Sequence, residues 1–212
     1  MKVNRVIKTL VVADFIINSA FGLSAPIFAI FLIDNVGGNA EVAGFAAAIY
    51  WIAKSLFQLP IANWLDKTDG EKDDFIALFI GQLIAGFTPF MYLFASLPWH
   101  VYAIEALLGL SMAFAVPAWY GIFTRHLDEG RASFEWSLES VFAVGVATAA
   151  SSALGGIIAN NYGFDVLFII AGVLALTGAF AFLLLWPYLK RRRGTGETFG
   201  MLNEKERHSQ GF

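Results

Sequence analysis

Residues 62–72 read ANWLDKTDGEK, and this stretch is the first charged interruption after a long apolar start. It carries three acids and two lysines, with a glycine at Gly70, between two apolar runs that are long enough to cross a membrane. These features predict a turn at a bilayer surface. Because lysine and arginine concentrate in cytoplasmic loops, the two lysines indicate that this surface is the cytoplasmic one.

The composition of the 212-residue chain indicates a membrane protein. The chain is 58% hydrophobic and 15% charged, which is more apolar and less charged than a soluble domain. A net charge of -3 argues against nucleic acid as a partner. The absence of cysteine excludes thiolate metal sites, and three scattered histidines do not suggest a metal cluster, so no metal or cofactor is expected.

Six apolar stretches reach the length of about 20 residues that a helix needs to cross the hydrocarbon. The first is too long for the apolar core of a secretory signal, so we expect it to be retained. The expected helices are Val6–Ile33, Glu41–Leu65, Phe75–Leu97, Trp99–Thr124, Phe134–Asn160 and Phe164–Leu189, and four of them contain an internal proline at Pro26, Pro60, Pro89 or Pro117. The predicted fold is therefore an all-α membrane protein, with a six-helix domain over residues 1–189 and a disordered cytoplasmic tail over residues 190–212.

Lysine and arginine lie in alternate loops, which predicts the orientation. They follow the second, fourth and sixth segments, at Lys67 and Lys72, at Arg125 and Arg131, and at residues 190–193. The opposite loops, residues 33–41, 96–100 and 160–165, contain neither residue type. By the positive-inside rule both termini are expected to be cytoplasmic, in a multi-pass protein of the inner (cytoplasmic) or another cell membrane.

Ionisable side chains inside the expected spans are the strongest functional signal, because each costs at least ~2.5 kcal/mol at bilayer depth and usually faces a cavity or a partner. Asp14 lies in the first helix, Lys54 in the second and Glu105 in the fourth. At about 1.5 Å per residue, Asp14 and Lys54 lie ~10 and ~15 Å from the cytoplasmic edge, so we expect them to pair. The pair either locks two helices together or lines a substrate or proton path.

Polar and aromatic neighbours extend these charges into a predicted pathway. Asn18 follows Asp14 by four residues, and Gln58 follows Lys54 by four, which places each pair on one helix face. The predicted pathway residues are Asp14, Asn18, Tyr50, Lys54, Gln58 and Glu105. The charged spans are the first, second, fourth and fifth, so these four helices are expected to enclose whatever is polar.

The fifth helix is rich in small residues, which favours close packing against another helix. Gly145, Gly155 and Gly156 are the predicted packing positions. Glu139 is interpreted, together with Glu135, as an acid near the helix start that complements the helix dipole. Ser133 is the expected N-cap.

Several passages resemble the amino-terminal half of the major facilitator superfamily of secondary transporters. They are the LDKTDG turn at residues 65–70, PAWYGIFTRHLDEGRASF at 117–134 and SSALGGIIANNYGFDVLFIIAGV at 151–173, and the resemblance covers about Val6 to Leu189. The chain departs from the family at three points. Glu71 replaces a base of the turn, Glu105 stands where proton-coupled members carry arginine, and Ser151 and Ser152 precede Gly155 where drug antiporters have a Gly-Pro pair.

The resemblance implies half of a twelve-helix transporter, because family members have two halves related by an axis along the membrane normal. The hypothesis is a half-size carrier that forms a parallel homodimer, with the pathway on the two-fold axis and alternating access to a small solute. Asp66, Lys67 and Gly70 are then the candidate cytoplasmic gate, with Asp66 approaching the start of the partner's fifth helix. That fifth helix would pack on the second helix of the other copy.

The expected partners are a second copy, membrane lipid and a small-molecule solute, with a coupling ion left open. The alternative function is a non-transporting or heterodimeric membrane subunit, such as one half of a split transporter. An enzyme is not expected, because no nucleophile, metal or phosphate-binding motif accompanies the intramembrane acids.

Overall fold

The first apolar stretch forms two helical pieces separated by a short break. The structure, a computed structural model, describes residues 3–67 and 70–189. α1 (Arg5–Ser24) begins at Asn4, whose side chain accepts a hydrogen bond from the backbone N–H of Ile7. A 3-10 turn, η1 (Ala25–Ile27), contains Pro26, and α2 (Phe28–Val36) follows. The 3-10 turn forms at Pro26 because proline lacks the N–H that a continuous α-helix needs.

The turn at residues 62–72 is shorter than the sequence indicates. α3 (Ala40–Asp66) continues through Asp66, and α4 (Lys72–Tyr92) begins at Lys72, so both helices extend into the charged stretch. Gly70 has a φ of 131°, a backbone conformation that favours glycine. Thr68 and Asp69 lie outside the described residues, as does the predicted tail over residues 190–212.

The remaining spans also form helices close to the predicted limits. α5 (Pro98–Arg125) is continuous. It is followed by α6 (Ala132–Leu138), a π-helix η2 (Glu139–Val146), α7 (Ala147–Ala181) and a 3-10 segment η3 (Phe182–Tyr188). The N-cap of α6 is Arg131, so the prediction of Ser133 as the N-cap is wrong; Ser133 already lies inside the first helical turn.

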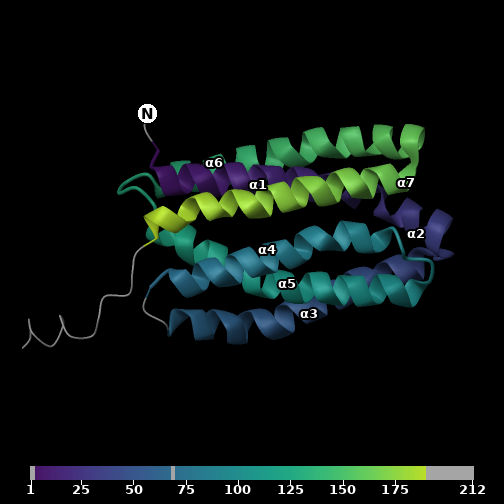
Figure 1. The fold of residues 1–212 in the computed structure, drawn as a ribbon, viewed down its shortest axis with the longest axis horizontal. Coiled ribbons are helices and arrows are strands. Elements are labelled where there is room, and N and C mark those ends of the chain that lie inside the picture. Colours follow the sequence, from purple (N-terminus) through teal and green to yellow (C-terminus); the bar gives the residue numbers. More distant parts are fainter. Residues whose placement is uncertain (1–2, 68–69, 190–212) are drawn as a thin grey trace, which may run out of the picture.

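Residues 132–188 contain two spans and not one. Five helical stretches are long and apolar enough to cross a membrane, and the last comprises 57 residues, far longer than one crossing. It contains a non-helical residue, Gly163, with φ 84° and ψ 170°. Figure 1 shows that α7 reverses direction at the right-hand end of the bundle, so its two arms are antiparallel. The all-helical fold with six spans is therefore confirmed.

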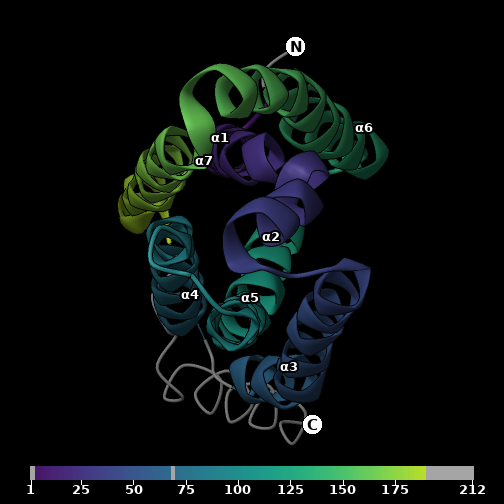
Figure 2. The same cartoon turned by 90° about the vertical axis from the view of Figure 1, so that its right-hand side faces the viewer.

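Two ends of the bundle can be distinguished (Figure 1). One carries Arg5, Lys67, Arg125 and Tyr188, and we call it the basic end; the other carries Gly37, Leu97 and Gly163 and is called the opposite end. α1 packs on α7, α3 packs on α5, and α4 packs on both α5 and α7. Figure 2, viewed along the helices, shows α5 between α3 and the remainder of the bundle.

Candidate functional site

A pocket of about 290 Å³ lies between α1, α4, α5, α6 and η2, and we call it the acidic pocket. Its lining includes the polar and aromatic side chains of Asp14, Gln82, Trp119, Tyr120, Trp136, Glu139 and Ser140. Of the four helices predicted to enclose the pathway, the first, the fourth and the fifth contribute lining residues. α3 contributes none of the lining residues, and Gln82 of α4 takes part instead, because α4 and α3 pack on different sides of α5.

Two acids from different helices meet in the acidic pocket. The carboxyl groups of Asp14 and Glu139 are hydrogen-bonded to each other. Asn18, one turn after Asp14, donates to the second oxygen of Asp14 at 3.0 Å. Two carboxyl groups can share a hydrogen bond only when one of them carries a proton. The acidic pocket therefore brings two carboxyl groups from different helices together.

Two buried polar atoms in this pocket have no hydrogen-bond partner. They are Oε2 of Glu139 and Nε1 of Trp119, an acceptor and a donor. The ring of Trp119 is stacked on Phe123 at 4.7 Å between centroids, and Trp136 lies 6.0 Å from Trp119. Because buried polar groups in proteins are normally satisfied, these atoms indicate a site that is completed by water or by a ligand.

Glu139 is the residue that sequence reasoning misjudged. Glu139 is 5% exposed, and it is the first residue of the π-helix, directly after α6. Its interpretation as an acid that complements the helix dipole is therefore incomplete, because it faces Asp14 and not solvent. A single-turn or longer π-helix widens the helix locally and is frequent at functional sites. No periodicity in the sequence marks it.

The predicted ion pair between Asp14 and Lys54 does not form. Lys54 lies with its Nζ 4.9 Å from the ring centre of Trp51 and 5.8 Å from that of Tyr50, in two cation–π contacts within α3. Its helix packs on α5 and not on α1. A similar expected depth in the membrane does not suffice for pairing, since α5 lies between the helices that carry Asp14 and Lys54 (Figure 2).

Glu105 lies in a separate cavity toward the opposite end. Its side chain is 9% exposed and accepts a hydrogen bond of 2.8 Å from the hydroxyl of Tyr92. The cavity, of about 200 Å³, is lined by α1, η1, α2, α4, α5 and α7, and we call it the Glu105 cavity. The structure thus places Asp14 with Asn18, and Glu105 elsewhere, so the six predicted pathway residues do not form one cluster.

Gln58 and Asp66 line a cleft at the basic end, with a volume of about 440 Å³. Asp74, Tyr120 and Arg125 line the same cleft. Of the three predicted gate residues, Asp66 and Lys67 are exposed and Gly70 is half-buried in the turn. Their role as a gate stays a prediction.

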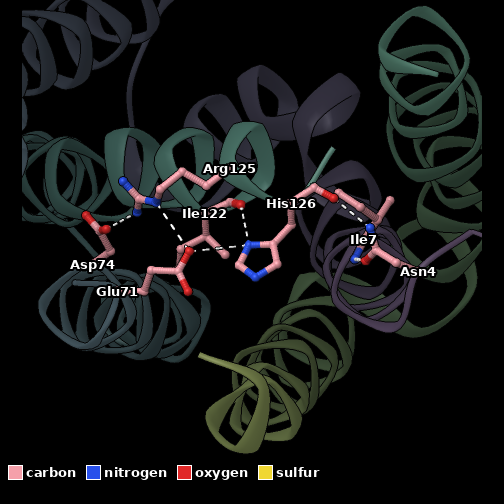
Figure 3. Close-up of polar contacts among 7 residues, drawn as sticks. All are labelled: Asn4, Ile7, Glu71, Asp74, Ile122, Arg125 and His126. Carbon is pink, nitrogen blue, oxygen red and sulfur yellow. Dashed lines mark hydrogen bonds and ion pairs between the residues drawn. The ribbon is translucent and has the colours of Figure 1, made fainter. Parts of the chain in front are cut away.

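Arg125 lies between two acids at the start of α4 (Figure 3). Its guanidinium forms ion pairs with Asp74 and, at 3.3 Å, with Glu71. His126 extends the group, since its Nδ1 lies 3.4 Å from Oε1 of Glu71. Glu71 is 2% exposed and Asp74 3%, so the end of α5 is tied to the start of α4 by contacts that the sequence did not reveal. Glu71, which stands where the family has a base, is one of the two acids that form ion pairs with Arg125.

Asn4 ties the start of α1 to the loop after α5. Its Nδ2 donates to the backbone carbonyl of His126 and, at 3.0 Å, to Oδ1 of Asp128. This hydrogen bond lowers the pKa of Asp128 below its usual value of 3.8. The backbone N–H of Asp128 donates to Glu135 at 3.0 Å, which links the loop to α6.

The three small-residue positions of the fifth span differ in their surroundings. A Cβ at Gly155 would lie 1.8 Å from the carbonyl oxygen of Leu23, so this glycine permits contact between α7 and α1. A Cβ at Gly156 would meet no atom within 4 Å, and one at Gly145 would meet only the carbonyl oxygen of Ser140 in its own helix, at 3.4 Å. Gly155 therefore packs against the first helix of the same chain, whereas a side chain at Gly145 or Gly156 would meet no other helix of the bundle.

The fold is that of a helical membrane protein, with several helices long and apolar enough to cross a membrane. A model of the Major Facilitator Superfamily matches residues 10–208, so the chain belongs to this family. The chain is 26% identical over 196 residues to the multidrug resistance protein MdtG of Escherichia fergusonii and 27% identical over 197 residues to that of Salmonella schwarzengrund. Each alignment covers 91% of this chain and 46% of the relative, so the chain spans about half the length of the curated relatives it matches.

A solved structure shows the same fold. The POT family transporter PepTSo superimposes with a TM-score of 0.72 at 16% sequence identity, over 92% of this chain and 40% of that chain. The predicted resemblance to one half of a major facilitator protein is therefore confirmed.

Proposed function

We propose that this chain is a secondary transporter that carries an amphipathic organic cation, with the acidic pocket as its half of the substrate site. The observation that carries the proposal is the hydrogen-bonded pair of Asp14 and Glu139 beside the rings of Trp119 and Trp136. Carboxyl groups attract a cation, and aromatic faces accept its charge and its apolar body. The name of the curated relatives, multidrug resistance protein, supports an organic substrate. This name contrasts with the sequence pattern, in which Ser151 and Ser152 precede Gly155 where drug antiporters have a Gly-Pro pair.

The coupling ion in this proposal is a proton. A cation that enters the pocket replaces the proton shared by Asp14 and Glu139, so substrate and proton compete for one negative charge. Competition of this kind produces exchange when the pocket opens alternately to the two membrane faces. The basic end is proposed to face the cytoplasm, on the strength of the lysine and arginine distribution. Catalysis forms no part of the proposed role.

The second half of the pathway is proposed to come from a second copy of the chain. α3 has only Ala46 and Leu65 among its buried residues, and Leu56 and Leu59 are 65% and 77% exposed. The fifth span leaves Val141 and Ile157 exposed, together with the open positions Gly145 and Gly156. A parallel two-fold dimer would cover these surfaces and place two acidic pockets across one axis. Lys54, Tyr50 and Gln58 remain proposed pathway residues on α3, and Asp66 and Lys67 the proposed gate.

The transport proposal is tested with purified protein in liposomes, using tetraphenylphosphonium as the probe cation and an imposed pH gradient. We expect proton-driven exchange in the unchanged protein and a loss of at least about tenfold in Asp14→Asn, because the shared proton and the charge are both removed. Glu129→Gln, which neutralises an exposed loop acid, should retain full exchange. Absence of flux in liposomes that contain folded dimer would favour the alternative function, a non-transporting or heterodimeric subunit.

A further inference from the structure

We infer that the Glu105 cavity is a second binding site, separate from the acidic pocket, for a small quaternary or alkyl ammonium ion. The cavity of about 200 Å³ exceeds an engineered apolar cavity of about 150 Å³ that holds benzene. Its walls come from four spans, through Phe21, Phe28, Thr88, Tyr92, Glu105 and Phe168. None of the residues that line the acidic pocket lines this cavity.

Four of the ten residues that line the cavity are aromatic. The ring centre of Tyr92 lies 5.2 Å from that of Phe28 and 5.2 Å from that of Phe168, so three rings from three spans adjoin the space beside Glu105. A cation with methyl or methylene groups against such rings gains cation–π attraction without losing a full hydration shell. The arrangement therefore matches an ammonium ion that carries apolar substituents.

The polar atoms of the cavity argue against a metal ion. The hydroxyl of Thr88 donates to the carbonyl of Ala85 at 2.7 Å, and that of Ser24 donates to Phe21 at 3.3 Å, each within its own helix. Hard metal cations such as Ca²⁺ need a shell of several oxygen ligands. Here the carboxyl group of Glu105 is the ionisable acid among the lining residues, so an organic cation fits and a bare metal ion does not.

The carboxyl group of Glu105 lies outside the ion pairs formed by the described residues. No lysine, arginine or histidine of residues 3–67 and 70–189 forms an ion pair with it. The titratable groups that act on it are the phenols of Tyr92 on α4 and Tyr50 on α3. α1, η1, α2 and α7 contribute no titratable side chain to the lining. A buried carboxylate of this kind is compensated either by a proton or by a bound cation.

The test is calorimetric titration of the purified full chain with choline and with its uncharged isostere, in which a tert-butyl group replaces the trimethylammonium group. We expect choline to bind more tightly than the isostere, and more tightly as the pH rises, because the proton on Glu105 must leave. Glu105→Gln should weaken choline by at least about tenfold, or about 1.4 kcal/mol, and leave the isostere unchanged. Glu41→Gln, an exposed acid near the same end, should bind choline normally.

A second variant protects the test against loss of folding. Phe28→Leu keeps most of the volume and removes one ring, so choline should weaken while the isostere does not. Equal affinity for choline and the isostere, or unchanged choline affinity in Glu105→Gln, would overturn the second site. Because the acidic pocket is itself proposed to bind organic cations, the titrations are repeated in Asp14→Asn, and the choline binding that depends on Glu105 should persist in that background. Failure of this binding is therefore distinguishable from failure of the proposed transport.

Discussion

Asn4 performs two tasks at the start of the first span. Its Oδ1 caps α1 by accepting from Ile7, and its Nδ2 holds Asp128 across the bundle. Capping contributes about 1 kcal/mol in typical helices and does not depend on pH. The hydrogen bond to Asp128 does depend on pH, because its acceptor is a carboxylate whose pKa it lowers.

The first prediction concerns this contact. Since the folded-state pKa of Asp128 is below its unfolded value of 3.8, the contact stabilises the protein above that value and is lost as the pH falls through the folded pKa. Asn4→Ala should therefore lower the unfolding temperature more at about pH 6 than at about pH 3. Unfolding in detergent micelles, followed by circular dichroism, measures the difference.

The control is Asp128→Asn, in which the effect of Asn4→Ala should become independent of pH over the same range. A difference that persists in this background would assign the pH dependence to another group.

Single residues also show the limits of charge counting. Asp14 and Lys54 were expected to pair because of their depth, and Glu139 was assigned to the helix start because of its position. In the folded chain, Asp14 pairs with Glu139 and Lys54 lies on Trp51. Depth and sequence position constrain only one coordinate, whereas pairing depends on which helix faces which.

At the scale of elements, the contact between α1 and α7 depends on small residues. Gly22 lies against Ser151, Gly155 against Leu23, and Gly178 against Ile17. A Cβ at Gly22 would lie 2.2 Å from Oγ of Ser151, and one at Gly178 would lie 2.5 Å from the side chain of Ile17. In a membrane the hydrophobic effect does not drive helices together, because lipid tails are as apolar as the side chains. Close packing and interhelical hydrogen bonds hold the helices together instead.

The second prediction tests this contact with adjacent glycines. Gly155→Val should destabilise the protein by about 2 kcal/mol or more, because its side chain would overlap the backbone of Leu23. Gly156→Val, which meets no atom of the chain within 4 Å, should be near neutral in the monomer. Thermal unfolding of both variants in detergent provides the comparison, and equal losses would contradict the close contact at Gly155.

The elements themselves follow from the sequence to a large extent. All six predicted spans are helical, and the breaks at Pro26 and Gly163 lie where proline and a glycine loop indicate them. The short helix α6 and the π-helix η2 were missed, because the periodicity of the fifth stretch does not distinguish an α-helix from a π-helix. The neighbours of Glu139 are therefore decided by an irregularity that composition does not encode.

At the scale of the whole molecule, α3 and the fifth span each leave an apolar side exposed among the described residues. The other side of α3 packs on α5, and the other side of the fifth span packs on α1. In a membrane such surfaces meet either lipid or another helix unit. The proposed two-fold dimer pairs one with the other, since α3 of one copy would face the fifth span of its partner.

The third prediction is a cross-link between copies. The chain has no cysteine, so Leu59→Cys in one tagged copy and Val141→Cys in a second, differently tagged copy provide the only thiols. Both positions lie roughly 10–15 Å from the basic end and are 77% and 62% exposed. A bifunctional thiol reagent should join the two tags in membranes. Leu184→Cys, 65% exposed on η3, should not join to Val141→Cys.

The dimer model would be wrong if these reagents gave no product between chains while the purified protein had the mass of one chain. A mass that requires a second, different polypeptide would favour the heterodimeric alternative. The size of a variant carrying Gly156→Val provides a further check, since this exposed position should affect association and not folding.

The sequence by itself determined the solvent, the number of spans, their approximate limits and the family. These properties depend on the length and spacing of apolar runs, on prolines and glycines, and on lysine and arginine in the loops, all of which are local. The tertiary structure alone decided that Asp14 faces Glu139, that Glu105 occupies its own cavity and that Arg125 joins Glu71 to Asp74. Such contacts depend on the rotation and neighbours of each helix, and these are set by close packing at small residues rather than by the pattern of any one span.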